Sequence, residues 1–318
     1  MLLDRIPELE DIREAAIRIK DYTHQTPALT SLNISEYTGA HLFFKAENLQ
    51  KAGAFKSRGA CNAIFSLDNE DLEYGVATHS SGNHAQALAR AAMLIKTKSY
   101  IVMPKNAPAS KVAAVRNYGG EITFCEPNLA SREENLKRLI DETGSVEIHP
   151  YNNYSIIAGQ ATACLEFIEQ VDTLDYILAP VGGGGLLSGT CLSASYLSPK
   201  TKVIGVEPEL ANDAYRSFRE GRIIAALPPK TIADGLLTSL GTITFPIIRE
   251  YCHDIVTVSE ESIIKAMRLI WERMKIIVEP SAAVPLAAIL EKKIEIKGKR
   301  IGIILSGGNL DLDKLPWK

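Results

Sequence analysis

The sequence predicts an α/β fold in which parallel-type β-sheets carry helices on both faces. Short runs rich in apolar and β-branched residues alternate along the 318 residues with stretches of helical periodicity, which is the pattern of β-α units. The runs are apolar at successive positions, as expected for strands whose two faces are both buried. We therefore expect open, twisted sheets with helices packed against each side.

Eight predicted strands follow one another, and each leads into a glycine, a proline or a helix-capping residue. They are 41–47 (HLFFKAE), 74–80 (YGVATHS), 99–104 (SYIVMP), 121–125 (EITFC), 175–181 (DYILAPV), 202–208 (KVIGVEP), 254–259 (DIVTVS) and 300–306 (RIGIILS). The clearest helix is 258–274 (VSEESIIKAMRLIWERM), where Ser259 is the predicted N-cap and two glutamates stand in the first turn.

The length exceeds a typical domain of about 100 to 200 residues. The β-α units within residues 72–150 are predicted to form a small domain with its own sheet. Residues 1–71 and 151–318 would then form a larger, discontinuous domain. One large α/β unit is the alternative, because no linker composition marks a boundary.

Composition and charge exclude several functional classes. Hydrophobic residues make up 46%, charged residues 23%, and the net charge is −3, so neither nucleic acid nor an anionic membrane is an expected partner. Five widely spaced cysteines without a C-x-x-C pair predict reduced thiols rather than disulfides or a zinc site. The N-terminal stretch carries acidic residues where a signal peptide needs basic ones, which predicts a cytoplasmic protein.

Three stretches suggest one small-molecule site. Lys56 stands among small residues in AGAFKSRGA (52–60), where a surface lysine at a helix start is the alternative. Four glycines in PVGGGGLLSG (180–189) follow a predicted strand and open a helix, so their amides can bind a phosphate. HSSGNHAQAL (79–88) likewise follows a strand and gathers hydroxyl, amide and imidazole groups, as either an anion-binding loop or a polar helix cap.

A fourth stretch, ILSGGNLDL (304–312), ends the last predicted strand and places Ser306 at the edge where ligands of open parallel sheets collect. In this order, the four stretches resemble the fold type II pyridoxal-phosphate enzymes, which have the tryptophan synthase β-like fold. The nearest resemblance is to the serine racemase and serine/threonine dehydratase family. It covers nearly the whole chain and includes TPALTS (26–31), IAGQATACLE (157–166), TIADG (231–235) and WERMKIIVEPSAA (271–283).

The resemblance implies roles for the residues around the cofactor, pyridoxal 5′-phosphate. Lys56 would form the Schiff base with the cofactor aldehyde, and Phe55 would pack beside the pyridine ring. Asn83 would hydrogen-bond the ring hydroxyl, and Ser306 would face the ring nitrogen. A serine there does not enforce ring protonation, which favours elimination over transamination. The phosphate is expected at Gly182, Gly183, Gly184, Gly185 and the amide of Leu186.

The implied reaction is β-elimination of hydroxyl from L-serine or L-threonine, which gives a 2-oxo acid and ammonia. Lys56 would remove the α-proton. The substrate carboxylate is expected at Ser80, Ser81, Asn83 and His84. Because the racemase branch of the family carries serine at the position of Ser81, serine racemase activity is also expected, with Ser81 as the second acid/base.

The resemblance also implies a divalent metal site in GVEPELANDAYRS (205–217). Glu207, Asp213 and the carbonyl of Ala211 would bind Mg²⁺, Mn²⁺ or Ca²⁺, which prefer oxygen ligands. Without the resemblance, solvated surface charges are the alternative. The family further suggests a homodimer.

Two other functions remain open. An L-threo-3-hydroxyaspartate ammonia-lyase of the same fold would need a cation for the second substrate carboxylate, and Arg132 in SREENLKRL (131–139) is the candidate. Asparagines in HPYNNYS (149–155) stand where relatives often carry an acidic residue, which leaves the substrate open. A non-catalytic protein that binds pyridoxal phosphate or a nucleotide is the alternative of another class.

Overall fold

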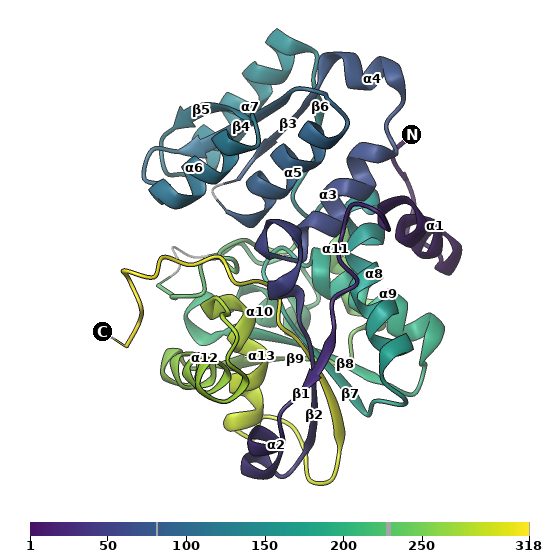
Figure 1. Cartoon of the computed structure of the whole chain (residues 1–318), viewed down its shortest axis with the longest axis vertical. Helices are drawn as coiled ribbons and strands as arrows, with labels where there is room; N and C mark the ends of the chain where they lie inside the picture. The colour runs from purple at the N-terminus through teal and green to yellow at the C-terminus, as the bar shows by residue number, and fades with distance from the viewer. Residues whose placement is uncertain (81, 227–229, 318) are drawn as a thin grey trace.

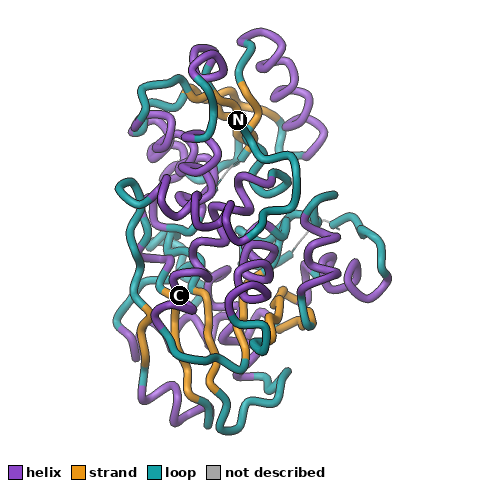
Figure 2. The backbone as a smooth tube through the Cα atoms, turned by 90° about the vertical axis from the view of Figure 1, so that its right-hand side faces the viewer, coloured by secondary structure: helices purple, strands orange, loops and turns teal. Residues whose placement is uncertain are grey.

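The computed structural model describes residues 1–80, 82–226 and 230–317. It has the predicted α/β architecture, with two separate sheets that each contain parallel strands. Figure 1 shows the sheets at opposite ends of the long axis, with helices between them. In Figure 2 the strands accordingly form two groups. We call residues 76–147, which carry the smaller sheet, the four-stranded unit, and the rest the six-stranded unit.

The larger sheet has the strand order β1-β2-β10-β7-β8-β9. Its strands are β1 (Ala28–Thr30), β2 (His41–Lys45), β7 (Tyr176–Pro180), β8 (Lys202–Pro208), β9 (Asp254–Val258) and β10 (Arg300–Ile304). Neighbouring strands pair in parallel from β2 to β9, while β1 pairs antiparallel with β2. The short edge strand β1 was not among the predicted strands.

The smaller sheet is parallel throughout, with the order β5-β4-β3-β6. Its strands are β3 (Val76–His79), β4 (Ser99–Pro104), β5 (Glu121–Cys125) and the two-residue β6 (Val146–Glu147). The strands from β3 to β6 match the segment predicted to have a sheet of its own. The exact domain boundaries at residues 71/72 and 150/151 stay a prediction.

The helices cover both sheets on two faces. They are α1 (Leu9–Ile19), α2 (Leu32–Thr38), α3 (Lys56–Phe65), α4 (Asn69–Tyr74), α5 (Asn83–Leu94), α6 (Ala109–Asn117), α7 (Leu129–Thr143), α8 (Tyr154–Gln170), α9 (Gly185–Leu197), α10 (Asp213–Glu220), α11 (Thr244–Tyr251), α12 (Glu260–Met274) and α13 (Pro280–Leu290). Three short 3-10 turns, η1 (Glu47–Leu49), η2 (Lys51–Gly53) and η3 (Glu209–Ala211), complete the described elements.

Alternate residues of the strands face different helices. On the six-stranded sheet, Ile303 packs in the cluster that includes Leu286 of α13, whereas Ile304 packs with Leu187 of α9. On the smaller sheet, β3 and β4 contribute to one cluster with α5 and to another with α7. Burial on both faces explains why these strands are apolar at successive positions.

Helix α12 confirms the predicted helix start, because the side chain of Ser259 accepts a hydrogen bond from the backbone of Ser262. Two glutamates follow in its first turn, where the helix dipole favours negative charge. Across the described ranges, no helix combines the length and the apolar character needed to cross a membrane.

Candidate active site

Lys56 is the first residue of α3, and its side chain is half-buried. The Nζ atom donates a hydrogen bond of 2.7 Å to the carbonyl of Pro150 and lies 5.2 Å from the centre of the Phe55 ring. Burial lowers the pKa of Lys56 to about 8, since desolvation disfavours the ammonium form. The amine is therefore partly neutral near physiological pH, as a nucleophile or base requires.

Buried charges anchor the helix that carries Lys56. Arg58, in the first turn of α3, is fully buried and bonds Glu47 at 2.8 Å and Glu166 at 2.7 Å. Lys45 also contacts Glu166, at 2.7 Å. Because each charge has partners of opposite sign, the network offsets the cost of removing these groups from water. It ties α3 to β2, η1 and α8, so the position of Lys56 is fixed by tertiary contacts.

The 79–84 loop joins β3 to α5 and has the predicted polar character. The amide of Ser80 donates to Val102 at 3.1 Å, which continues the strand pairing, and the Ser80 hydroxyl accepts from the Gly82 amide at 3.2 Å. Ser81, predicted as the second acid/base, lies outside the described residues. The loop brings Asn83 to the N-terminus of α5, where the helix dipole favours an anion.

His84 is buried, with one ring nitrogen, Nε2, 3.1 Å from the carbonyl of Ile148. Its Nδ1 atom has no hydrogen-bond partner among the described residues. Burial holds the pKa of His84 well below its usual value, and the nearby charge of Lys56 lowers it further. We conclude that the ring is neutral, donates from Nε2 and keeps Nδ1 as an acceptor.

Asn83 connects the two units at the site. Its Nδ2 atom donates to Glu279 at 2.8 Å, and its Oδ1 atom accepts from Asn309 at 3.0 Å. Asn309 also donates to the carbonyl of Ala52 at 2.7 Å. Sequence analysis did not single out Glu279, although it lies in the WERMKIIVEPSAA stretch, because its contact with Asn83 spans 196 residues of chain.

The glycine run forms a tight turn between β7 and α9. Gly184 has a φ of +91°, which favours glycine. A Cβ atom on Gly183 would lie 2.3 Å from the ring of Tyr151, and one on Gly184 would lie 2.9 Å from Leu240. Only glycines at these positions therefore let the backbone pack so closely against Tyr151 and Leu240. The amides of Gly185 and Leu186 belong to the first turn of α9, which suits a phosphate.

The segment 149–151 brings the predicted motifs together. Pro150 binds Lys56, and the next residue, Tyr151, packs on the glycine run. The ring of His149 lies 4.6 Å from that of Tyr151 and 5.9 Å from that of His79, at the start of the 79–84 loop. Lysine, loop and glycine run thus surround one short segment whose central position the sequence did not reveal.

Ser306 adjoins the same group. It is 3% exposed, and its carbonyl accepts a 3.0 Å hydrogen bond from the amide of Phe55. A bridge between Ala54 and Gly307 runs alongside. The end of β10 therefore lies directly beside Lys56. This position is compatible with the prediction that the Ser306 hydroxyl faces the cofactor ring.

Arg132 lies in the first turn of α7, on the His79 side of the site. Its Nε atom is buried and has no hydrogen-bond partner within the described ranges. Burial lowers the pKa of His79, and the charge of Arg132 lowers it further. Burial, with His79 and Lys56 nearby, lowers the pKa of His149 to about 3. Basic groups therefore gather on this side of the site, and the environment of both histidines favours the neutral ring.

The predicted metal ligands lie at the end of β8. Glu207 is buried and accepts hydrogen bonds from the amides of Ala214 (3.0 Å) and Tyr215 (2.8 Å). Burial and the charge of Asp213 raise the pKa of Glu207 to about 9, and burial raises that of Asp213 to about 6. Asp213 Oδ2 is buried without a hydrogen-bond partner in the described structure, which suits a cation ligand.

Ala211 ends the short turn η3 that separates the two carboxylates. With only two acidic side chains, the proposed set depends on a backbone carbonyl and water for its other ligands. No group of three His, Cys, Asp or Glu side chains among the residues that the structure describes is arranged to hold a metal. All five cysteines are buried and free.

Comparisons with known proteins agree with this geometry. The model of the family described as "Pyridoxal-phosphate dependent enzyme" matches residues 19–307. The chain is 53% identical to the beta-hydroxyaspartate dehydratase of Paracoccus denitrificans, over 98% of this chain and 99% of that protein. It is 54% identical to the serine racemase of Dictyostelium discoideum, over 96% of each chain.

Among solved structures, a threonine deaminase from T.th. has a TM-score of 0.92 and 46% sequence identity, with coverage of 96% of this chain and 99% of that one. The family model covers the first three predicted motifs in full and the fourth up to residue 307. The chain belongs to the pyridoxal-phosphate dependent enzymes, in the serine racemase and dehydratase family.

Proposed function

We propose that this enzyme catalyses β-elimination of hydroxyl from L-serine and L-threonine and that it also racemises serine. The observation that carries the proposal is Lys56, a half-buried amine whose pKa is lowered to about 8, at the meeting point of the 79–84 loop, the glycine run and Ser306. Relatives named as serine racemase and threonine deaminase support it.

The residues around Lys56 suit pyridoxal phosphate. Bound to an amino acid, this cofactor supplies an electron sink that stabilises negative charge at the α-carbon. We infer that Lys56 binds it covalently, Phe55 packs beside its ring, Asn83 donates to its ring hydroxyl and Ser306 faces its ring nitrogen. The phosphate would be bound by the backbone at Gly182, Gly183, Gly184, Gly185 and Leu186, where added Cβ atoms would collide with Leu236, Tyr151 and Leu240.

Lys56 would also act as the base that removes the substrate α-proton. Its lowered pKa would keep a useful fraction of the amine deprotonated near neutral pH. Ser306 is a hydroxyl and not a carboxylate, so it does not enforce a proton on the ring nitrogen. A weaker electron sink favours loss of the β-hydroxyl over transamination.

The substrate carboxylate would bind at the 79–84 loop. Ser80, Ser81, Asn83 and His84 supply hydroxyl, amide and imidazole groups at the start of α5, where the helix dipole adds to the attraction. Racemisation needs an acid/base on each face of the planar substrate. We assign Lys56 to one face and Ser81 to the other, on the basis of sequence.

A second candidate substrate is L-threo-3-hydroxyaspartate. The observation that favours it is the buried, unpartnered Nε of Arg132 in the described structure, on the His79 side of the site. The planar, charged guanidinium group of an arginine binds a carboxylate well, because it can donate two parallel hydrogen bonds. The Paracoccus relative is named as a dehydratase of beta-hydroxyaspartate.

We further propose that Glu207, Asp213 and the carbonyl of Ala211 bind Mg²⁺, Mn²⁺ or Ca²⁺. Two observations support this: Asp213 Oδ2 has no hydrogen-bond partner in the described structure, and the charge of Asp213 contributes to the raised pKa of the buried Glu207. A cytoplasmic homodimer that binds neither membrane nor nucleic acid, with domains at 1–71 plus 151–318 and at 72–150, remains our proposal from the sequence.

The decisive experiment is incubation of the purified protein with L-serine, D-serine, L-threonine and L-threo-3-hydroxyaspartate. We expect a 2-oxo acid and ammonia from the L-substrates and slow interconversion of the serine enantiomers. A protein without turnover on all four, whose yellow colour still disappears with hydroxylamine, would instead be a non-catalytic binder of pyridoxal phosphate.

A further inference from the structure

A buried hydroxyl lies against the glycine run. Thr244 is the first residue of α11 and is fully buried. Its Oγ1 atom donates a 2.8 Å hydrogen bond to the carbonyl of Gly183 and accepts one of 2.8 Å from the amide of Gly241. The carbonyl of Gly241, at 3.2 Å, is the weaker alternative acceptor. A Cβ atom on Gly184 would lie 2.9 Å from the Cβ atom of Thr244, so Thr244 contacts the centre of the run.

The amides of the glycine run have no protein partner. Residues 182–186 are all buried, yet within the described ranges none of their N–H groups donates to a carbonyl or a side chain. Buried backbone donors are almost always paired in native proteins, with protein groups, with water or with a ligand. Several unpaired donors in succession therefore support the phosphate site that we propose here.

The hydrogen bond from Thr244 sets the direction of one of these amides. The peptide bond between Gly183 and Gly184 is trans, so its C=O and N–H groups point in opposite directions. Because the carbonyl of Gly183 is directed at Thr244, the N–H of Gly184 is directed away from it. Glycines on both sides leave this peptide free to rotate, and Gly184 already has a φ of +91°. Thr244 is the side chain that restricts this rotation.

The turn that carries Thr244 is itself anchored. Asn152 Oδ1 accepts a 2.9 Å hydrogen bond from the amide of Ile243, and Asn152 Nδ2 donates to the hydroxyl of Thr242 at 3.1 Å. Asn152 stands two positions after Pro150, whose carbonyl binds the active-site lysine. The hydroxyl of Thr244 is therefore held in a fixed place relative to both the glycine run and the lysine.

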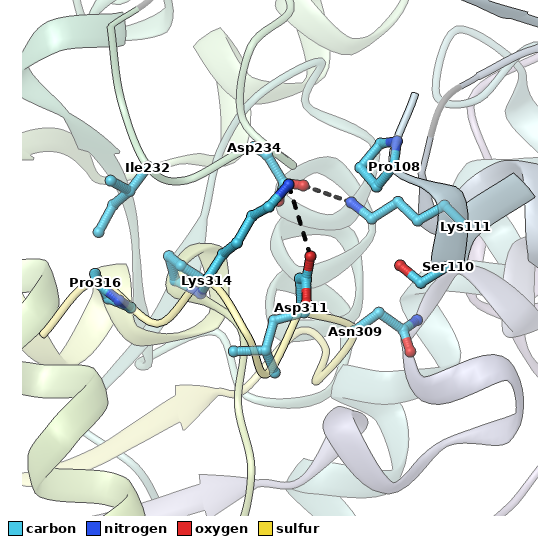
Figure 3. A pocket seen from close by; sticks show the side chains of 11 residues that line it. Pro108, Ser110, Lys111, Ile232, Asp234, Asn309, Asp311, Lys314 and Pro316 are labelled. Carbon is cyan, nitrogen blue, oxygen red and sulfur yellow. Dashed lines mark hydrogen bonds and ion pairs between the residues drawn. The ribbon is translucent and has the colours of Figure 1, made fainter. Parts of the chain in front are cut away.

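A second place where an anion could bind is the pocket in Figure 3, which contains Lys111 and Lys314. Each of these lysines already faces a carboxylate. Lys111 pairs with Asp234, and Lys314 Nζ lies 3.8 Å from a carboxylate oxygen of Asp311. The cations of this pocket are therefore partly neutralised, whereas the N–H groups of the glycine run are unpaired. The glycine run is thus the better site for a phosphate.

We propose that Thr244 is a positioning residue for the cofactor phosphate. Its hydroxyl fixes the peptide between Gly183 and Gly184, so that the amides of the glycine run converge on one anion. The proposal rests on the assignment of the phosphate to this run. Because the amides are oriented before the anion binds, binding loses less conformational entropy. Thr244 acts through the backbone and not on the reacting atoms.

The test compares Thr244→Val, which removes the hydroxyl at nearly constant volume, with Thr244→Ser, which keeps it. The cofactor-free protein is titrated with pyridoxal 5′-phosphate and with pyridoxal, which has the same aldehyde but no phosphate. Thr244→Val is expected to weaken binding of pyridoxal 5′-phosphate about three- to tenfold, the scale of one hydrogen bond, and to leave pyridoxal binding as in wild type. Thr244→Ser should bind both compounds as wild type does.

The control is Lys314→Met, in the pocket of Figure 3, which should also match wild type. Urea unfolding of the cofactor-free variants checks their folding, and Thr244→Ala is titrated with the same expectation if Thr244→Val does not fold. Equal weakening for both compounds would assign Thr244 a general structural role. That result, or unchanged affinity for pyridoxal 5′-phosphate without the hydroxyl, would overturn the proposal.

A measurement on wild type separates this proposal from the assignment on which it rests. Amide hydrogen exchange of residues 184–186 is expected to slow several-fold when pyridoxal 5′-phosphate binds and to change little with pyridoxal. Protection in wild type together with normal affinity in Thr244→Val would disprove the role of Thr244 alone. Without protection, the phosphate does not bind at the glycine run, and both the assignment and the role of Thr244 fail.

Discussion

Asn83 donates a 2.8 Å hydrogen bond to the buried carboxyl of Glu279, across the boundary between the two units. Burial, together with the nearby charge of Asp234, raises the pKa of Glu279 to about 7. The side-chain amide that we assign to the cofactor ring hydroxyl is therefore oriented by a group that changes its charge near neutral pH. The hydrogen bond between Asn83 and Glu279 therefore makes both the proposed cofactor contact and the contact between the two units sensitive to pH.

The raised pKa of Glu279 makes a prediction for stability. The folded carboxyl, with a pKa of about 7, holds a proton that the unfolded one, with a value of 4.5, has released. The contribution of this carboxyl to the free energy of unfolding is full below pH 4.5 and is lost as pH rises through 7. Wild type should therefore lose up to about 3 kcal/mol of stability. Glu279→Gln, which stays neutral, should not show this loss.

Urea unfolding of the cofactor-free protein at pH 5, 6, 7 and 8 measures this. The free energy of unfolding of Glu279→Gln should rise relative to that of wild type from pH 5 to pH 7 and level off between pH 7 and pH 8. Glu272→Gln, at an exposed position of α12, is the control and should show no such gain. A difference between Glu279→Gln and wild type that stays constant with pH would mean that the carboxyl is already ionised at pH 5.

Replacement of Lys56 by alanine is expected to abolish turnover and leave the fold intact, because one amine serves as both the cofactor anchor and the α-proton base. The network around Arg58 keeps α3 in place without it. Substrate assays, with circular dichroism as the control for folding, provide the measurement. Substantial dehydratase activity in the variant would exclude this assignment.

Eight strands were predicted from the sequence and found in the structure, whereas β1 and β6 were missed. The missed strands are three and two residues long, too short for a hydrophobic period to be visible, and they depend on pairing with β2 and β3. Local sequence identifies a strand only where enough residues share one environment.

The residues of the site likewise fall into those that the sequence indicated and those that it did not. Lys56 and the glycine run stand out in the sequence because small residues and glycines surround them. The roles of Pro150, Tyr151 and Glu279 did not stand out, since each depends on a contact with a residue far away in the chain. Tertiary packing alone brings these groups into contact with Lys56, the glycine run and Asn83 respectively.

The metal site predicts a stability effect of divalent cations. Mg²⁺, Mn²⁺ or Ca²⁺ bound only to the native state would raise the melting temperature by mass action, and Asp213→Ala should remove the increase. Thermal melts with each cation and with a chelator measure this, with Asp311→Ala as a control for nonspecific charge effects. A melting temperature that does not respond to any of the cations would contradict ligation by Glu207 and Asp213.

Arg132 discriminates between the two candidate substrate classes. If it binds a distal carboxylate, Arg132→Ala should lower kcat/KM for L-threo-3-hydroxyaspartate about tenfold or more, the scale of a hydrogen bond to a charged group. L-Serine, which lacks that carboxylate, should be affected less than about threefold. Arg138, on the same helix but paired with Glu142, is the matched control. Equal losses for both substrates would assign Arg132 a structural role.

Ser81 separates racemisation from elimination. Dehydratases that only eliminate usually have alanine at the matching position, by the family resemblance, and elimination from an L-substrate needs Lys56 alone. Ser81→Ala is therefore expected to keep most L-serine dehydration and to lose both D-serine formation and D-serine dehydration. Ser80→Ala, which removes the neighbouring hydroxyl, is the control and should impair both enantiomers alike through weaker carboxylate binding. Chiral analysis of serine in deuterated water adds a direct readout, because a variant without the second acid/base should still exchange the α-proton of L-serine while its configuration is retained. Interconversion of the enantiomers at the wild-type rate in Ser81→Ala would show that another group serves the second face.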